Sequence, residues 1–283
     1  WIGPSLGDWL AMGKGIAWQA MHNNPVSNAF IVHDLKVISE TAERLGKKAD
    51  ADRYRRQMEA TTEAYIRKFV SKKGIVAKDY QSAYIMALKF VLPEGELREQ
   101  VKKNFAANIR KNGLQTGFFA TEHLLPLLVE AGETELAYDI LLQEGCPGWM
   151  YQVKCGATTT WERWDALKPD GTVNEEKMAG SGDNMVSFNH YAFGSVGEFY
   201  YQYILGIKPQ KPGFAELHFE PYPDRRLGGV SGSYLSRAGK IESSWKYEED
   251  GCHISLNTPV KSEVVLPDGK KETVEAGTYQ WLC

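Results

Sequence analysis

The chain has 283 residues, of which 43% are hydrophobic and 24% are charged, and its net charge is −3. This length suits one large domain with a smaller one, and the apolar fraction is ordinary for a globular protein. Acidic and basic residues are interspersed, so we expect no nucleic acid as a partner. No run of about 18 apolar residues occurs, so we expect no membrane span.

The cysteines bear on metal and cofactor binding, and the first residues bear on the cellular compartment. No pair of cysteines forms a CxxC motif and no histidine lies at zinc-ligand spacing, so we expect no metal and no cofactor. The chain starts with Trp1 and has no basic and apolar leader, so we expect that an upstream segment was lost. Because targeting information would go with that segment, the compartment stays open. The cysteines are Cys146, Cys155, Cys252 and Cys283.

Residues from about 26 to 145 have the period of amphipathic helices. Gly46 follows the first apolar stripe at a position typical of a helix C-cap. Residues 83–92 are apolar nearly all round, which predicts a buried helix. A turn at Gly132 separates two further helices, which short connections make antiparallel neighbours. The stripes are Ile31, Leu35, Ile38, Ala42 and Leu45; Tyr54, Met58, Thr61, Tyr65 and Phe69; and Leu97, Val101, Phe105 and Ile109.

Buried and amphipathic helices alternate along this region, as a double-layered ring of helices requires. A helical solenoid gives a similar pattern, but no repeat of fixed period favours it. We expect the last helix to begin near Phe188 and to carry Val196, Phe199 and Tyr203.

The period changes to two after the stretch GIKPQKPGF, residues 206–214, whose glycines and prolines mark a boundary. The segments ELHFE, KIESSWKY, HISLN and EVVLP alternate between apolar and polar residues, with turn signals near residues 228, 249 and 268. We therefore predict a helical domain over residues 1–208 and a small antiparallel β-sandwich over residues 209–283.

The residues with the most chemical information lie between the periodic segments. The stretch TTTWERWD, residues 158–165, places Glu162 between Trp161 and Trp164 on a β-branched, non-helical segment. Apolar rings raise the pKa of a carboxyl group and a nearby arginine lowers it, so Glu162 is a candidate base whose pKa can be tuned. Indoles also stack on the C–H faces of sugars. The alternative is a structural ion pair of Arg163 with Glu162 or Asp165.

Three other motifs carry polar and aromatic residues on loops. In GDWLA, Asp8 and Trp9 are either a sugar-binding pair or a helix N-cap beside a core tryptophan. TGFFATEHLLP, residues 116–126, lines a groove or simply begins a helix. In SFNHYAFG, Asn189 and His190 either hold a water or sugar hydroxyl or belong to the core. Together these features indicate glycoside hydrolysis, which needs two carboxyl groups, about 6.5–9.5 Å apart in an inverting enzyme.

Five segments in this order resemble the bacterial α-L-rhamnosidases of glycoside hydrolase family 78. They are GDWLA, QSAYIMALKF, TGFFATEHLLPLL, AYDILLQEGCPGWMYQVKCGATTTWERWD and VSFNHYAFGSVGEFYYQYILGIKP. The resemblance covers residues 6–283, including the strand with ESSWKYE. It implies a six-hairpin (α/α)6 barrel followed by a C-terminal β-sandwich.

The resemblance also implies removal of terminal α-L-rhamnose with inversion at the anomeric carbon, and therefore a rhamnose-containing glycoside as the partner molecule. It gives Glu162 the role of general base and makes His190 a supporting residue. Trp9 is implied to line the rhamnose pocket. Asp8, Trp161 and Asn189 are implied as further binding residues.

One motif of that family is missing from this chain. The family's general acid lies in an acidic motif far upstream of the GDW step, and nothing similar occurs here. The chain also has fewer predicted helices than the barrel contains. It therefore resembles the C-terminal part of such an enzyme, with little activity alone and a tendency to self-associate through uncovered helix faces. A sugar-binding module without chemistry, a structural scaffold and another barrel glycosidase are the alternatives.

Overall fold

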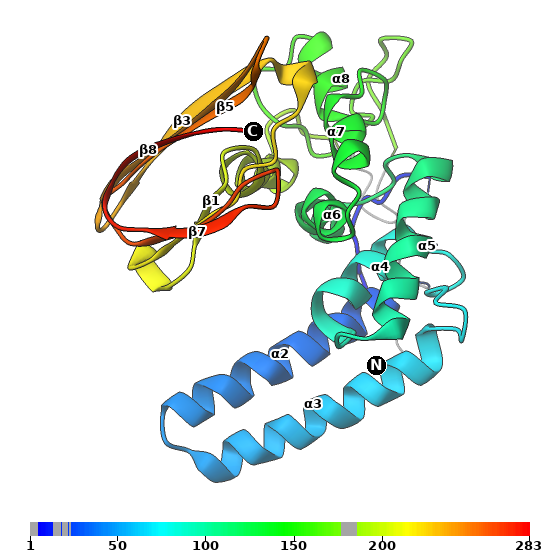
Figure 1. Cartoon of the computed structure of the whole chain (residues 1–283). Helices are drawn as coiled ribbons and strands as arrows, with labels where there is room; N and C mark the ends of the chain where they lie inside the picture. Colours follow the sequence, from blue (N-terminus) through cyan, green and yellow to red (C-terminus); the bar gives the residue numbers. More distant parts are fainter. Residues whose placement is uncertain (1–4, 14–17, 19–21, 23, 177–185) are drawn as a thin grey trace. The chain divides into compact units, whose positions relative to one another are not determined.

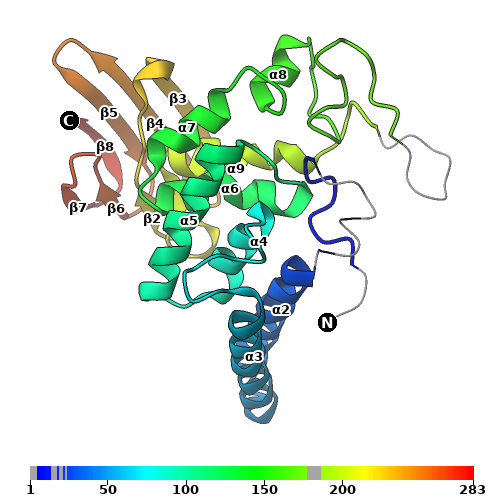
Figure 2. The same cartoon turned by 90° about the vertical axis from the view of Figure 1, so that its right-hand side faces the viewer.

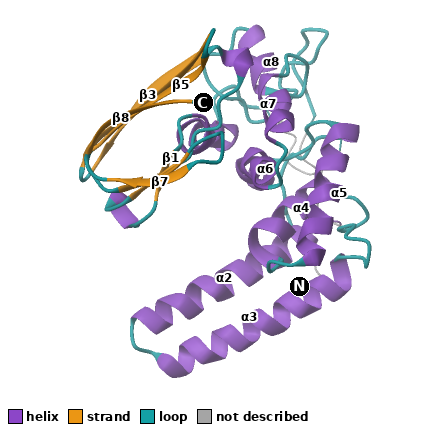
Figure 3. Ribbon diagram, viewed as in Figure 1, coloured by secondary structure: helices purple, strands orange, loops and turns teal. Residues whose placement is uncertain are grey.

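The computed structural model describes residues 5–13, 18, 22, 24–176 and 186–283, and it divides into two compact units, Trp1–Gly194 and Ser195–Cys283. The first unit is helical and the second is built mainly of strands, as the secondary-structure colours of Figure 3 show. The sequence predicts a domain boundary after residue 208, later than this division. Among the described helices, none combines the length and the apolar character needed to cross a membrane.

The helices α2 (Asn24–Arg44) and α3 (Lys48–Phe69) form an antiparallel hairpin and lie side by side in Figures 1 and 2. Gly46 adopts a φ of 71° in the connection. This left-handed conformation is favoured by glycine and ends a helix, so the predicted C-cap position is found in the structure.

The buried face of α2 differs from the predicted apolar stripe. Of that stripe only Ala42 is fully buried, whereas Ile38 is 43% exposed and Leu45 is 66% exposed. The buried residues of α2 are mostly small, including Ala29 and Ser39, whose hydroxyl donates to the Ala51 carbonyl of α3. Small side chains let two helix backbones approach closely, and the periodic pattern alone does not reveal which face does so.

The stretch predicted as a buried helix forms α4 (Gln81–Met86) and continues as a π-helical turn, η1 (Ala87–Val91). Every residue of α4 is buried, which confirms the prediction from its all-round apolar pattern. Arg98 of α5 (Glu96–Asn112) donates through Nη1 to the carbonyls of Leu88 (2.5 Å) and Leu92 (3.0 Å). These bonds satisfy carbonyl groups that the end of a helix leaves without partners.

The predicted helix pair is present as α6 (Phe118–Glu130) and α7 (Thr134–Leu142), with Gly132 at φ 77° in the turn between them. The short helix α8 (Trp149–Lys154) follows, and a long irregular stretch then carries residues 155–176. This stretch contains the TTTWERWD motif, so the segment is non-helical as its three threonines predict.

The last helical segment begins later than predicted. It consists of a 3₁₀ turn (Ala192–Ser195), α9 (Val196–Phe199) and a π-helical turn (Tyr200–Ile204). Residues 187–190 are not helical, because their backbone groups pair with the segment around Thr160. The end of this segment belongs to the second unit, where Trp245 donates from Nε1 to the Ile204 carbonyl (2.7 Å).

The second unit contains two four-stranded sheets, with strand orders β1-β2-β6-β7 and β3-β4-β5-β8. Their facing sides bury alternate residues, such as Ile241 and Trp245 on β4 and Ile254 and Leu256 on β5. This confirms the predicted sheet domain. The strands are β1 (Ile207–Pro209), β2 (Leu217–Phe219), β3 (Gly229–Ser236), β4 (Gly239–Glu248), β5 (Gly251–Thr258), β6 (Ser262–Val265), β7 (Lys271–Val274) and β8 (Gly277–Leu282).

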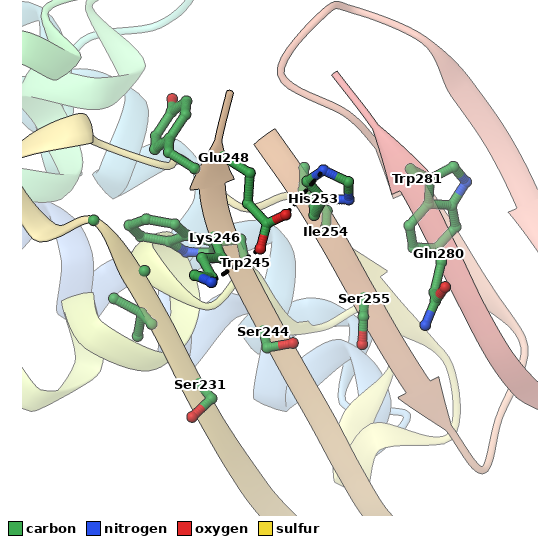
Figure 4. A pocket seen from close by; sticks show the side chains of 14 residues that line it. Ser231, Ser244, Trp245, Lys246, Glu248, His253, Ile254, Ser255, Gln280 and Trp281 are labelled. Atoms are coloured by element: carbon green, nitrogen blue, oxygen red, sulfur yellow. Dashed lines mark hydrogen bonds and ion pairs between the residues drawn. The ribbon is translucent and has the colours of Figure 1, made fainter. Parts of the chain in front are cut away.

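One pair of strands departs from the predicted antiparallel pairing, since β2 and β6 run parallel. The outer face of the second sheet carries short polar side chains at opposed positions, Ser231, Ser244, Ser255 and Gln280 (Figure 4). They line a shallow groove of about 700 Å³.

A charged group in the second unit predicts how its stability depends on pH. Oε2 of Glu220 lies 3.2 Å from Nε2 of His218 and 3.1 Å from Nζ of Lys208. The His218 hydrogen bond, followed by the Lys208 charge, lowers the pKa of Glu220 from 4.5 to about 2. A lowered folded-state pKa stabilises the fold above the unfolded-state pKa, and this stabilisation is lost as the pH falls through the folded-state value.

We expect the free energy of unfolding to fall by at most about 3 kcal/mol from this group between pH 4.5 and pH 2. Glu220→Gln should flatten the pH dependence in this window, measured by urea unfolding at several pH values. Glu249→Gln, which changes an exposed residue of the β4–β5 turn, is the control. Equal pH slopes for Glu220→Gln and the unmodified chain would contradict the expectation.

Candidate functional site

The segment with Glu162 and the segment with His190 run side by side in the first unit. The Glu162 amide donates to the Ser187 carbonyl (2.8 Å), and the His190 amide donates to the Thr160 carbonyl (2.9 Å). The Thr160 hydroxyl returns a bond to the His190 carbonyl (2.6 Å). Two residues that are far apart in the sequence are therefore held on adjoining pieces of backbone.

The two tryptophans beside Glu162 anchor this loop in the interior. Trp164 is fully buried, stacks on Phe193 with ring centroids 3.8 Å apart, and donates from Nε1 to the Thr116 carbonyl (2.8 Å). Trp161 is 3% exposed, and its amide donates to Oε1 of Gln152 (3.0 Å). Trp164 is therefore a core residue and offers no face to a sugar, although an indole beside Glu162 was a candidate for stacking on one.

Arg163 pairs with acids other than Glu162. Its Nε lies 2.9 Å from Asp165 and its Nη2 lies 2.7 Å from Glu176, and the guanidinium is almost buried. The alternative ion pair with Asp165 is thus present, whereas none with Glu162 is found. Within the described part of the chain, no hydrogen bond or ion pair reaches the Glu162 carboxylate, which is half-buried. The Glu162 carboxylate is left available to a water or a ligand.

The His190 ring has one nitrogen engaged with the backbone. The Ala192 amide donates to Nδ1 (3.2 Å), so a neutral ring carries its proton on Nε2. The ring is half-buried between Phe118 and Tyr191, with centroids 4.7 Å and 5.0 Å away. This arrangement makes Nε2 a hydrogen-bond donor whose direction is set by two aromatic neighbours.

Asp8 is completely buried and accepts four hydrogen bonds. Oδ2 accepts from the Ser82 hydroxyl (2.5 Å) and the Gly117 amide (2.7 Å). Oδ1 accepts from the amides of Phe119 (2.8 Å) and Ala120 (3.0 Å). Burial raises the pKa of Asp8, and these hydrogen bonds offset part of the increase. The carboxylate therefore caps the N-terminus of α6 from a remote segment, where negative charge is favourable.

The capping contact also fixes Trp9 against the start of α6. The Trp9 carbonyl accepts from the Phe118 amide (3.0 Å), and the Trp9 side chain is half-buried. A Cβ at Gly117 would lie 2.1 Å from the Trp9 carbonyl oxygen, so only glycine allows this approach. The predicted helix entry in TGFFATEHLLP is present, and its glycine serves the close packing of two loops.

The predicted site residues divide by accessibility. Glu162, His190 and Trp9 are half-buried, and Asn189, which precedes His190 in the sequence, is exposed. Asp8 and Trp161 are buried, so direct binding of a ligand by either of them stays a prediction that the described contacts do not support.

Two aromatic neighbours of His190 were missed in the sequence. Tyr191 is 87% exposed and nearly parallel to the His190 ring, with an interplanar angle of 14°. Its position directly after the Asn-His pair was the available signal. Phe118 touches the same ring from α6, and no local signal links these two positions because the contact is purely tertiary.

Two known family models match the chain, and the first of them spans all four motifs. The bacterial α-L-rhamnosidase six-hairpin glycosidase domain matches residues 2–204, and the bacterial α-L-rhamnosidase C-terminal domain matches residues 206–280. The chain belongs to the bacterial α-L-rhamnosidases. Both the resemblance seen in the sequence and the predicted fold, part of a six-hairpin barrel with a β domain, are confirmed.

Individual α-L-rhamnosidases are similar over nearly the whole chain. That of Alteromonas sp. (strain LOR) is 35% identical over 274 residues, which cover 93% of this chain and 29% of that protein. The crystal structure of the Streptomyces avermitilis enzyme complexed with L-rhamnose has a TM-score of 0.87 at 29% identity. This match covers 98% of this chain and 28% of the Streptomyces chain. The crystal structure of native α-L-rhamnosidase from Aspergillus terreus has a TM-score of 0.87 at 29% identity. This match covers 97% of this chain and 32% of the Aspergillus chain. The chain thus spans less than a third of the length of each of these relatives.

Proposed function

We propose that this chain provides the general base and part of the sugar pocket of an α-L-rhamnosidase that removes terminal, non-reducing α-L-rhamnose with inversion. The observation that carries the proposal is the Glu162 carboxylate. It is half-buried, it lacks a partner among the described residues, and it lies on a loop anchored by Trp161 and Trp164. The relative crystallised with L-rhamnose supports the choice of sugar.

In the proposed reaction, Glu162 takes a proton from a water molecule as that water attacks the anomeric carbon. The attack comes from the face opposite the leaving oxygen, so the configuration inverts. A second carboxyl group protonates the leaving oxygen, about 6.5–9.5 Å from the first. We expect this general acid from the part of the enzyme that lies outside the residues of this chain.

The test is hydrolysis of an aryl α-L-rhamnoside, followed by NMR of the first sugar anomer released. The complete enzyme should release β-L-rhamnose first, whereas retention would give the α-anomer and overturn the inverting mechanism. On an alkyl α-L-rhamnoside, whose leaving oxygen needs protonation, the chain alone should be slower than the complete enzyme by about 10²–10⁴, the typical contribution of general acid catalysis. Saturable rhamnose binding without turnover by the complete enzyme would favour a binding module instead.

His190 is proposed to orient the attacking water or a sugar hydroxyl through Nε2. Two substitutions separate its nitrogens, because an asparagine amide occupies roughly the Nδ1 position and a glutamine amide roughly the Nε2 position. We expect His190→Gln in the complete enzyme to retain about tenfold more kcat/KM than His190→Asn, as one hydrogen bond to a reacting group implies. The opposite order would assign His190 a structural role through the Ala192 amide.

A further inference from the structure

Two cysteines of the second unit stand directly opposite each other on neighbouring strands. The Cys252 amide donates to the Cys283 carbonyl (2.8 Å), and the Cys283 amide donates back to the Cys252 carbonyl (3.0 Å). This exchange extends the register of β5 and β8 by one residue beyond the pair of His253 and Leu282. Figure 4 shows the two strands side by side, with His253 on β5 and Trp281 on β8.

The register brings the two sulfur atoms to the same face of the sheet. Residues that exchange both backbone hydrogen bonds have Cα atoms about 5.5 Å apart and project in the same direction. Disulfides form across Cα separations of about 4.4–6.8 Å. Cys252 lies on the same face of β5 as Ile254, and both are buried. Cys283 lies on the same face as Trp281, and both are less exposed than Leu282 between them. The pair therefore has the placement that a disulfide requires, although both thiols are free in this structure.

We propose that Cys252 and Cys283 form a reversible cross-strand disulfide when the chain meets a disulfide oxidant such as oxidised glutathione. The two thiols lose two electrons and two protons, and one S–S bond forms between them. The oxidant's S–S bond breaks, and its two halves leave as thiols. The consequence is a covalent link between β5 and β8, the strand at the edge of its sheet.

The difference in burial predicts the order of the steps. Cys283 is only partly buried, whereas Cys252 is 3% exposed, so Cys283 should attack the oxidant first. Cys252 then attacks the resulting mixed disulfide and releases the second glutathione. Burial raises the pKa of both thiols, and since the thiolate is the nucleophile, the reaction should be faster at higher pH.

The other two cysteines provide an internal comparison. Cys155 is exposed, and Cys146 is half-buried with its thiol directed to the Trp164 carbonyl (3.6 Å). Neither lies on a described strand, so no sheet register places them opposite each other. They should remain separate thiols, or take up glutathione singly, under conditions that link Cys252 to Cys283.

The experiment is to treat the unmodified chain with oxidised glutathione, alkylate it and map its peptides by mass spectrometry. We expect a linked peptide containing Cys252 and Cys283, the loss of both of these alkylatable thiols, and reversal by dithiothreitol. Cys252→Ser should stop at a glutathione adduct on Cys283, as a first attack by Cys283 requires. A chain that keeps both thiols alkylatable, or links them only between molecules, would overturn the proposal.

A stability measurement distinguishes a native link from one formed after unfolding. The disulfide closes a loop of the β unit, so the oxidised chain should unfold about 5 °C or more above the reduced chain. The same oxidant should leave the unfolding temperature of Cys283→Ser unchanged. A lower unfolding temperature on oxidation would show that the link distorts the strand pair, and would contradict a site built for it.

Discussion

Glu162→Gln in the complete enzyme should lower kcat for α-L-rhamnosides by about 10²–10⁴ while rhamnose binding changes little. Glutamine keeps the size of the side chain but cannot accept the proton of the attacking water. The carboxylate has no ion pair with the described residues, so its neutralisation should leave the fold intact. Steady-state kinetics and calorimetric titration with rhamnose measure the two effects separately.

The leaving group distinguishes a lost base from a lost acid. A nitrophenolate leaves without protonation, whereas an alkoxide needs an acid, so a base variant should lose similar factors on aryl and alkyl rhamnosides. Added azide should restore turnover on the aryl substrate, because azide attacks without needing a base. Glu130→Gln, an equal change at the exposed end of α6, is the matched control. Ordinary turnover by Glu162→Gln would remove Glu162 from the mechanism.

The largest stability effect is expected at Asp8, outside the reaction chemistry. Asp8→Ala removes the acceptor of the Ser82 hydroxyl and of three backbone amides at the start of α6. Buried donors without partners are costly, so the free energy of unfolding should drop by about 3–5 kcal/mol. Hydrogen exchange should become faster at the amides of Gly117, Phe119 and Ala120. This measurement localises the lost contacts, whereas urea unfolding reports only the total loss of stability.

Two variants calibrate the Asp8 result. Ser82→Ala deletes one donor and keeps the three backbone bonds, so it should lose about 1 kcal/mol. Asp34→Ala changes an exposed residue of α2 and should stay within about 0.5 kcal/mol of the unmodified chain. If Asp8→Ala kept both the stability and the amide protection, the capping role would be wrong. Because the same contact holds Trp9 against Phe118, kcat/KM of the complete enzyme should fall as well.

The sequence by itself determined the kinds of elements and the family. The 3.6-residue and two-residue periods identified the helical and stranded parts, and residues 83–92, which are apolar nearly all round, identified a buried helix. These features depend on neighbours along the chain, where propensity and solvent exposure act directly. The ordered motifs likewise required only the sequence, and the family models match the same residues.

Only the tertiary structure decided what each motif residue does. Asp8 was a candidate cap for its own segment, yet it caps α6, whose amides are distant in the sequence. In the sequence, Trp164 and Trp9 were equal candidates for stacking on a sugar. In the structure, Trp164 is buried and stacks on Phe193. The pairing of the Glu162 and His190 segments is set by long-range backbone hydrogen bonds, which produce no periodic pattern in the sequence. The positions of Cys252 and Cys283 in the sequence do not predict their contact, because the register of the strands brings them together.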